Sequence, residues 1–177
     1  MLYMLSMAKK YLTVSMLFLL LSCNEVEKSK DHTYQFYSIQ FEPASQLVLA
    51  PQVAADSTLR YYDYQVEYGN NTVFTLTYSR GDSIATDSGV SDIVVFEVDS
   101  STTDFEAKGK NLKNYNVLNE ERCFCAEAHS NRPVRMSEGE IQGIRIDPLT
   151  WFVKVKVGMI DLEDTVKVNQ KKIISLK

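Results

Sequence analysis

Cysteine and histidine are scarce in this sequence. Its 177 residues include three cysteines and two histidines, too few for a disulfide-rich scaffold, and a zinc site normally takes three or four protein ligands. The motifs of phosphate-binding loops, dinucleotide-binding domains, zinc proteases and nucleophile-elbow hydrolases do not occur in it. The sequence therefore indicates no cofactor and favours a protein without enzymatic activity.

Long apolar runs and blocks of positive charge are also missing. The longest mostly apolar stretch, residues 11–21, is too short for a transmembrane helix, which needs about 20 residues. Lysine and arginine are spread along the chain, and the formal net charge is −4. Because binding to nucleic acid needs clustered cations, nucleic acid is not an expected partner.

The amino terminus does contain an ordered pattern. Two lysines at positions 9 and 10 precede the apolar stretch, and residues 20–23 are Leu-Leu-Ser-Cys. A basic region, a short apolar core and a small residue before a cysteine resemble the lipobox signal of bacterial lipoproteins. In that family the chain is cut just before the cysteine, which is acylated. The resemblance implies that Ser22 is the last residue removed and that Cys23 carries the lipid.

This resemblance divides the chain into three parts. They are a signal peptide (1–22), a lipidated cysteine with a polar tether (23–32) and a single domain (33–177). Cleavage would change the net charge to −6, because the signal peptide holds two lysines and no acidic residue. Lipid on Cys23 implies an anchor in a membrane of the cell envelope. Glu25 and Glu27 loosely resemble a surface-export signal of Bacteroidota lipoproteins, so the outer membrane is the expected location, on a face that the sequence leaves open.

From residue 33 onward, apolar and polar residues alternate, which indicates β-strands. Residues 62–68 and 74–78 alternate on either side of Gly69-Asn70-Asn71, which predicts a β-hairpin that turns at these three residues. Residues 140–146 and 151–157 predict a second hairpin, with a β-bulge at Gly143 where the apolar phase slips. Further strands are expected at residues 33–42, 46–50, 93–98, 165–169 and 172–176.

The expected fold class is all-β. Many short strands separated by turns predict an antiparallel β-sandwich or a small β-barrel. Residues 105–121 come closest to a helical period, but Gly109 and several asparagines allow at most one short helix there. Ten tyrosines and eight phenylalanines suit a two-sheet core, and they would equally suit an aromatic-lined cavity.

The segment with Cys123, Cys125 and His129 is the one stretch that suggests chemistry. On a strand these three odd-numbered residues would share a face, and two thiolates with an imidazole suit copper(I) or zinc. Outside the cytoplasm, the two thiols could instead form a disulfide with each other or with another chain. The plainest interpretation is that both cysteines pack in the core.

Three sites resemble the Asp-Ser/Thr-apolar motif at which Bacteroidota O-glycosylate proteins. They would place sugars on Ser57, Ser83 and Thr165 and would require exposed loops there. The alternative is that aspartate with serine or threonine is common in turns.

Taken together, these patterns predict a lipid-anchored envelope protein whose domain binds a partner and catalyses no reaction. The expected partners are another envelope protein, a polysaccharide or a small ligand. Two alternatives stay open, namely a thiol- or metal-handling protein that uses Cys123, Cys125 and His129, and a lipocalin-like carrier whose residues 62–68 line a cavity. The lipobox does not discriminate among them, because lipoproteins share an anchor and no common fold.

Overall fold

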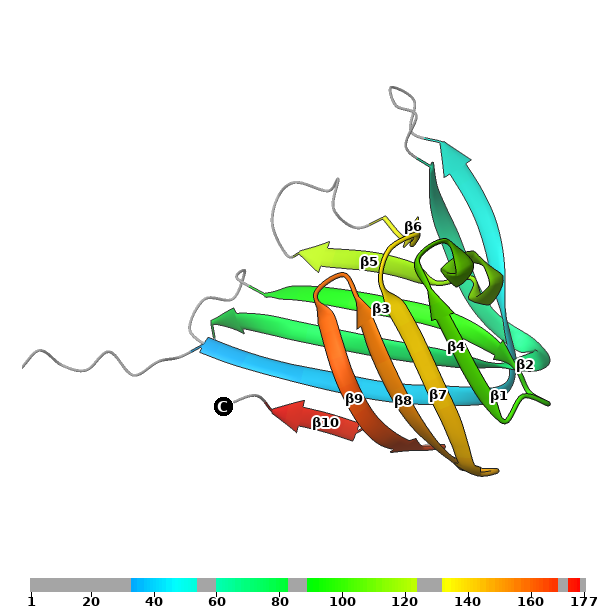
Figure 1. Cartoon of the computed structure of the whole chain (residues 1–177). Coiled ribbons are helices and arrows are strands. Elements are labelled where there is room, and N and C mark those ends of the chain that lie inside the picture. Colours follow the sequence, from blue (N-terminus) through cyan, green and yellow to red (C-terminus); the bar gives the residue numbers. More distant parts are fainter. Residues whose placement is uncertain (1–32, 54–59, 83–88, 124–131, 169–171, 176–177) are drawn as a thin grey trace, which may run out of the picture. The chain divides into compact units, whose positions relative to one another are not determined.

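The alternating sequence forms ten strands and one short 3₁₀ helix in the residues that a computed structural model of the chain describes, which are 33–53, 60–82, 89–123, 132–168 and 172–175 (Figure 1). The elements are β1 (Thr33–Val53), β2 (Arg60–Asp82), β3 (Val90–Asp99), β4 (Asp104–Lys108), η1 (Gly109–Tyr115), β5 (Leu118–Cys123), β6 (Val134–Arg135), β7 (Glu140–Asp147), β8 (Thr150–Val157), β9 (Ile160–Lys167) and β10 (Lys172–Ser175). None of the described residues forms a helix long and apolar enough to cross a membrane.

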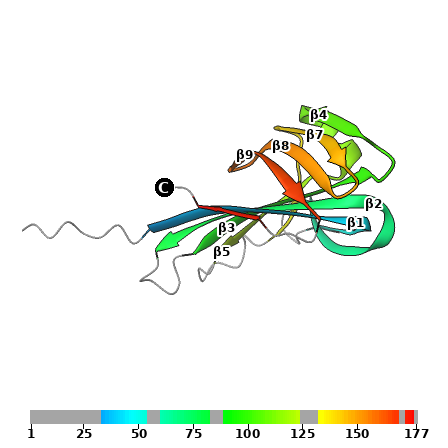
Figure 2. The same cartoon turned by 90° about the horizontal axis from the view of Figure 1, so that it is seen from below.

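Two antiparallel sheets contain all of these strands. One sheet has six strands in the order β10-β1-β2-β3-β5-β6, and the other has four in the order β4-β7-β8-β9. Figure 2 shows the four-stranded sheet lying on one face of the six-stranded sheet. The all-β prediction is confirmed, and of its two forms the chain adopts the sandwich.

The main core fills the space between the two sheets. Phe74 of β2 lies among four other rings, with centroid distances of 5.6 Å to Phe41, 5.0 Å to Phe96, 5.8 Å to Phe105 and 5.5 Å to Trp151. These side chains come from both sheets, and Trp151 and Phe74 are fully buried. The abundant aromatic residues therefore join the two sheets by direct packing.

The predicted hairpin at Gly69-Asn70-Asn71 is wrong. The chain does not reverse there, because residues 60–82 form one continuous strand, β2, whose partner along its whole length is β1. Instead both strands bend at a β-bulge, where Ser45 of β1 pairs with Tyr68 and with Asn71. Ala44, beside the bulge, has a φ of 53°. The turn-like residues Gly69-Asn70-Asn71 therefore mark an irregular backbone at which the two paired strands bend, and not a chain reversal.

Beyond this bend, residues 46–53 of β1 and 60–68 of β2 form a two-stranded extension, which we call the arm. Figure 2 shows it curling away from the four-stranded sheet, toward the opposite face of the six-stranded sheet. There Leu47 packs in a second apolar cluster with Val73, Ile93 and Val95, and Leu49 and Tyr64 cover the cluster. The arm thus has a small core of its own.

Gly143 was predicted to mark a β-bulge, and this prediction is also wrong. Gly143 pairs regularly with Val153, and the register of β7 shifts later, between Arg145 and Asp147. Gly143 is needed for space, since a Cβ there would lie 2.3 Å from Cε1 of Phe105. The alternation of apolar and polar residues is interrupted at Gly143 because the ring of Phe105 occupies the core space that a side chain at this position would fill.

The short helix expected within residues 105–121 is confirmed as η1. It begins at Gly109 and buries Leu112, and Asn116 follows it in the left-handed conformation. The glycine therefore lies at the start of this helix, and an asparagine ends it.

Candidate binding surface on the arm

Glu97 of β3 fastens the arm to the six-stranded sheet near the bend. One of its carboxylate oxygens accepts hydrogen bonds from the backbone N–H of Leu47, at 2.9 Å, and from Nδ2 of Asn71, at 2.8 Å. The other accepts a bond of 2.5 Å from Nδ2 of Asn116. A carboxylate with three donors holds its neighbours more firmly than neutral acceptors would.

Glu120 of β5 makes the second polar attachment. Its side chain is buried and is held by Arg122, whose Nε and Nη2 lie 2.7 and 2.9 Å from the two carboxylate oxygens. The hydroxyl of Tyr64, on the arm, donates a hydrogen bond of 3.4 Å to the same carboxylate. Burial, reinforced by the negative charge of Glu120, raises the pKa of Tyr64. The phenol therefore stays protonated and able to donate.

Two arginines lie on tyrosine rings at the free end of the arm. The guanidinium carbon of Arg132 is 4.5 Å from the ring centroid of Tyr61, and that of Arg135 is 4.8 Å from the ring centroid of Tyr62. A backbone hydrogen bond of 2.8 Å from Tyr62 N to the carbonyl of Pro133 joins the arm to the segment that carries both arginines. Strand backbone thus positions both pairs.

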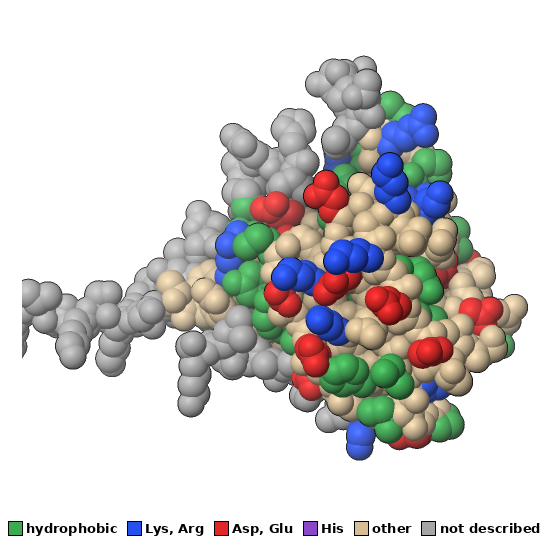
Figure 3. All heavy atoms as spheres, viewed as in Figure 1, with side chains coloured by type: hydrophobic (Ala, Val, Ile, Leu, Met, Phe, Trp, Pro, Cys, Tyr) green, Lys and Arg blue, Asp and Glu red, His purple; other side chains and the backbone are tan. Residues whose placement is uncertain are grey.

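These arginines belong to a group of cations that we call the basic end. In the part of the chain that the structure describes, none of its members lies within ion-pair distance of a carboxylate, whereas Lys108, Arg122, Lys154 and Lys156 all do. Figure 3 shows Lys and Arg side chains gathered over η1, β6 and the upper part of the arm. The basic end comprises Arg132 and Arg135, Arg60 next to Tyr61 on the arm, and Lys110 and Lys113 of η1, whose C-cap Asn116 accepts a hydrogen bond from Arg135.

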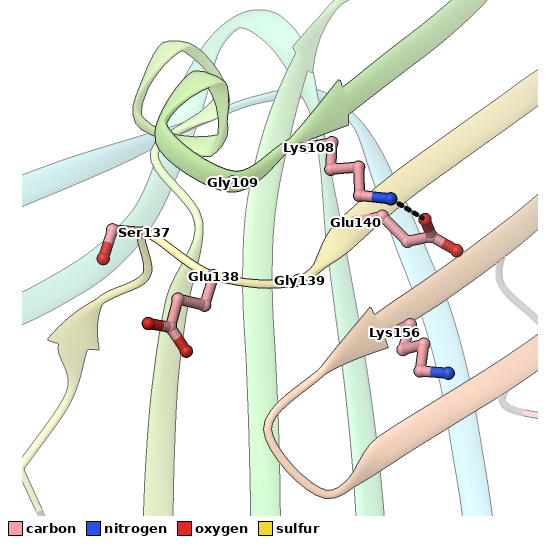
Figure 4. Close-up of a pocket in the computed structure, with 7 residues that line it drawn as sticks. All are labelled: Lys108, Gly109, Ser137, Glu138, Gly139, Glu140 and Lys156. Atoms are coloured by element: carbon pink, nitrogen blue, oxygen red, sulfur yellow. Dashed lines mark ion pairs between the residues drawn. The ribbon is translucent and has the colours of Figure 1, made fainter.

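A second candidate is a cleft of about 430 Å³, which Figure 4 shows beside the start of β7. Nζ of Lys108 and Nζ of Lys154 each lie 3.7 Å from a carboxylate oxygen of Glu140, and Nζ of Lys156 lies 3.5 Å from Asp161. Because these lysines are already paired, the cleft is a weaker candidate than the basic end. It is lined by Lys108, Gly109, Ser137, Glu138, Gly139, Glu140 and Lys156.

The acidic side chains of this region do not form a catalytic pair. In Figure 4 the carboxylates of Glu138 and Glu140 point away from each other, whereas glycoside hydrolysis needs two carboxyls that converge on one bond. Within the described residues, no group of three or more His, Cys, Asp and Glu side chains is placed to hold a metal ion.

The structure describes few of the site residues that the sequence suggested. Cys123 ends β5 and is disulfide-bonded. Cys23, Cys125 and His129 lie outside the described residues, so the predicted lipid attachment and the predicted thiol or metal site are not described.

The proposed O-glycosylation sites are described in part. Ser57 and Ser83 lie outside the described residues. Thr165 lies within β9, opposite Phe152 of β8, and its side chain is partly buried. This is a strand position and not the exposed loop that the motif led us to expect.

The basic end is the feature that sequence reasoning missed. Alternation placed Tyr62 and Tyr64 on one strand face, but nothing local linked Tyr61 or Tyr62 to arginines about 70 positions further along the chain. The spacing of Arg132 and Arg135 was the only signal, and two arginines three residues apart are too common to identify a site.

Comparisons of the chain with protein-family models, with curated proteins and with solved structures found no match. Function must therefore be argued from the residues themselves.

Proposed function

We propose that this protein is a binding module, without catalytic activity, that a lipid on Cys23 anchors in the cell envelope, in the outer membrane. The single observation that carries the binding role is the arm. It presents Tyr61 and Tyr62 from a two-stranded support, and the adjoining segment lays Arg132 and Arg135 on these rings; side chains held in this way lose little entropy when a ligand binds. The arrangement serves recognition and offers no evident reaction chemistry.

The lipid anchor is supported by the amino-terminal pattern alone. A basic region, an apolar core and Leu-Leu-Ser-Cys at residues 20–23 match the lipobox, and the polar residues 24–32 suit a tether between lipid and domain. An anchored domain meets its ligand at a membrane surface, where its affinity can be modest because the anchor raises its local concentration.

The non-catalytic role is supported by the described side chains. General acid–base catalysis needs a titratable group whose pKa is shifted toward the working pH, in a cleft that admits substrate. The lysines of the cleft in Figure 4 are instead tied to neighbouring carboxylates. Tyr64, whose pKa is raised, is used to hold the arm.

The anchor is tested by partitioning the protein expressed in a bacterium that processes lipoproteins. Wild type should enter the detergent phase of Triton X-114, and its intact mass should equal that of residues 23–177 plus the acyl groups. Cys23→Ser should remain in the aqueous phase or persist as an uncleaved precursor. Recovery of Cys23→Ser in the detergent phase, at the same processed mass as wild type, would refute the anchor.

The binding role is tested separately, by recovering the native lipidated protein from its own envelope in a mild nonionic detergent. We expect a protein or a glycan to be retained in constant ratio, and to be lost from a variant that combines Arg132→Gln with Arg135→Gln. A variant that combines Lys154→Gln with Lys156→Gln removes the same charge from the four-stranded sheet and should retain the partner. If nothing retained depends on the two arginines, the arm is not the binding surface.

A further inference from the structure

We infer that the end of the β7–β8 hairpin contacts the surface of a lipid bilayer, an inference that rests on the lipid anchor proposed above. The first observation is exposure. Ile144, Ile146 and Leu149, which we call the apolar tip, are 51, 59 and 57% exposed, and Phe152, opposite Ile144, is only partly buried. Figure 3 shows hydrophobic side chains gathered toward the lower end of the four-stranded sheet, where Figure 1 places this hairpin end. Exposed aliphatic side chains grouped in this way mark a contact surface.

The charges beside the apolar tip suit a lipid surface. The carboxylate of Asp147, the last residue of β7, accepts a hydrogen bond of 2.8 Å from the backbone N–H of Leu149, so the protein replaces part of its hydration. Lys167 is exposed at the neighbouring end of β9, where its long side chain can reach lipid phosphates. Asp104 is exposed opposite Ile144, at the side of the tip away from the turn. An aliphatic tip with a cation beside it fits the layer in which headgroups meet acyl chains.

A second copy of the chain fits the apolar tip less well. Stable protein interfaces bury about 800 Å² on each side, and three aliphatic side chains, each about half exposed, provide only part of that area. A bilayer sets no such minimum for a protein that already has a lipid anchor, because the anchor supplies most of the affinity and the contact adds to it. The small size of the tip therefore favours a membrane.

The length of the tether keeps the membrane within reach. Residues 23–32 separate the proposed lipid from the start of β1 at Thr33, and a chain of this length spans about 35 Å at most. A domain the size of residues 33–177 is about 40 Å across. The bilayer is therefore the surface that the domain meets most often, and the apolar tip can turn toward it.

Contact at the apolar tip would give the arm a defined orientation. Figure 1 shows the arm and the end of the β7–β8 hairpin at opposite ends of the described domain. A flexible tether alone leaves a domain free to turn in all directions, whereas a second point of attachment restricts it. With the tip at the bilayer, the arm points away from the membrane, toward partners that lie beyond it.

The test places a tryptophan in the apolar tip and measures its contact with lipid. Leu149→Trp is the probe. Met159→Trp is the matched control, because Met159 is 51% exposed in the turn at the other end of β8. The full lipidated proteins are reconstituted into phosphatidylcholine vesicles, with and without lipids brominated near the carbonyl end of their acyl chains.

Bromine should quench the probe and not the control. The fluorescence of Leu149→Trp, above the background of Trp151 measured in wild type, should fall by about twofold or more, since an interfacial side chain lies about 5–10 Å deep. The fluorescence of Met159→Trp should not change with bromination.

A further variant tests whether the neighbours of Leu149 hold the tip in the bilayer. Adding Ile144→Thr and Ile146→Thr to Leu149→Trp keeps β-branched side chains in β7 but removes apolar area, so quenching should fall by about half or more. The same two substitutions without the added tryptophan should leave the emission of the buried Trp151 as in wild type, which shows that the sandwich is intact.

Three results would overturn the inference. They are equal quenching of Leu149→Trp and Met159→Trp, quenching that Ile144→Thr with Ile146→Thr leaves unchanged, and a dimer in detergent solution that these two substitutions dissociate, which would assign the tip to a second copy.

Failure of the anchor is recognised separately, by the detergent partitioning of Cys23→Ser. If that test refutes the anchor but excess vesicles still allow bromine to quench Leu149→Trp selectively, the tip binds lipid by itself and the inference stands. A confirmed anchor without selective quenching removes the tip and keeps the anchor, and failure of both tests removes both.

Discussion

The sandwich core and the arm are held in place by different forces. Among the described residues, 21 buried ones form one continuous cluster between the sheets, which includes Phe74 and Trp151. The second cluster, under the arm, has four buried members in the same described part of the chain, and Glu97 and Glu120 provide polar attachments beside it. The sandwich therefore depends on apolar burial, whereas the arm depends on a few directed bonds, which give less stability but fix geometry more closely.

The largest expected effect is the loss of a central ring from the sandwich. Phe74→Ala should lower the free energy of unfolding by about 3–5 kcal/mol, because it removes contacts with four rings and leaves a cavity. Urea denaturation followed by tryptophan fluorescence measures this directly, since Trp151 is buried in the same cluster.

Leu47→Ala is the matched truncation under the arm, and it should cost about 2 kcal/mol, at the lower end for leucine. Hydrogen exchange should rise in the arm and stay unchanged in β8. If Leu47→Ala instead unfolds the whole domain as readily as Phe74→Ala does, the arm and the sandwich are one cooperative unit, and the comparison between them fails.

A second effect in the sandwich comes from adding an atom. Gly143→Ala should cost about 1–3 kcal/mol, because the new Cβ would overlap the ring of Phe105. Combining it with Phe105→Leu, which vacates that space, should cost less than the two single changes added together. Strict additivity in thermal or urea denaturation would show that Gly143 does not act through this ring.

The same contrast explains how much could be predicted from the sequence. Alternation identified strands with one buried and one solvated face, such as residues 151–157. Residues 93–96 of β3 are buried on both faces, and an apolar run identified that strand. Sequence reasoning failed at two glycines. Gly69-Asn70-Asn71 was predicted to form a turn but lies at a bend of β2. Gly143 was predicted to mark a bulge but makes room for the ring of Phe105. A glycine signals an unusual backbone or a close approach, and the distant partner decides which.

The candidate site was less predictable than the fold. Its contacts join Tyr61 and Tyr62 to Arg132 and Arg135, and Glu97 to Leu47. Each contact spans 50 residues or more of sequence. Each also depends on the bend that swings the arm over β3 and β5, and the short pattern at that bend, Gly69-Asn70-Asn71, is equally typical of a hairpin turn.

Removing Glu97 should loosen the arm without loosening the sandwich. Glu97→Ala leaves the Leu47 N–H and the amides of Asn71 and Asn116 without this acceptor, at a cost of about 1–3 kcal/mol. Amide exchange at Leu47 should accelerate, while exchange in β8 should not change. Glu97→Gln keeps an acceptor of the same shape and should have a smaller effect. Uniform acceleration in both variants would mean that Glu97 supports the whole domain.

The smallest effect compares two aspartates by their pH dependence. Asp92 of β3 is only 4% exposed, and burial, together with the charge of Glu121, raises its pKa above the ordinary value of 3.8, although Arg80 opposes this. The folded chain then holds this proton more tightly than the unfolded chain, so wild type should lose stability as pH rises from 3.8 through the raised pKa. Asp92→Asn should therefore be the more stable protein at neutral pH, and its advantage should vanish in acid.

Asp147, the last residue of β7, should behave in the opposite way. The backbone N–H of Leu149 donates to its carboxylate at 2.8 Å, and this bond, with one from Thr150, lowers the pKa of Asp147. The ionised carboxylate of Asp147 therefore stabilises the folded domain at pH values above the ordinary pKa of aspartate. This stabilisation is lost as pH falls through the lowered pKa of the folded state. Asp147→Asn should therefore be slightly less stable than wild type at neutral pH and equal to it in strong acid. The urea midpoints of both variants can be measured between pH 2 and pH 7. As pH rises, the midpoint of Asp92→Asn should move above that of wild type and the midpoint of Asp147→Asn below it. If both move in the same direction, burial and hydrogen bonding do not distinguish the two carboxyls.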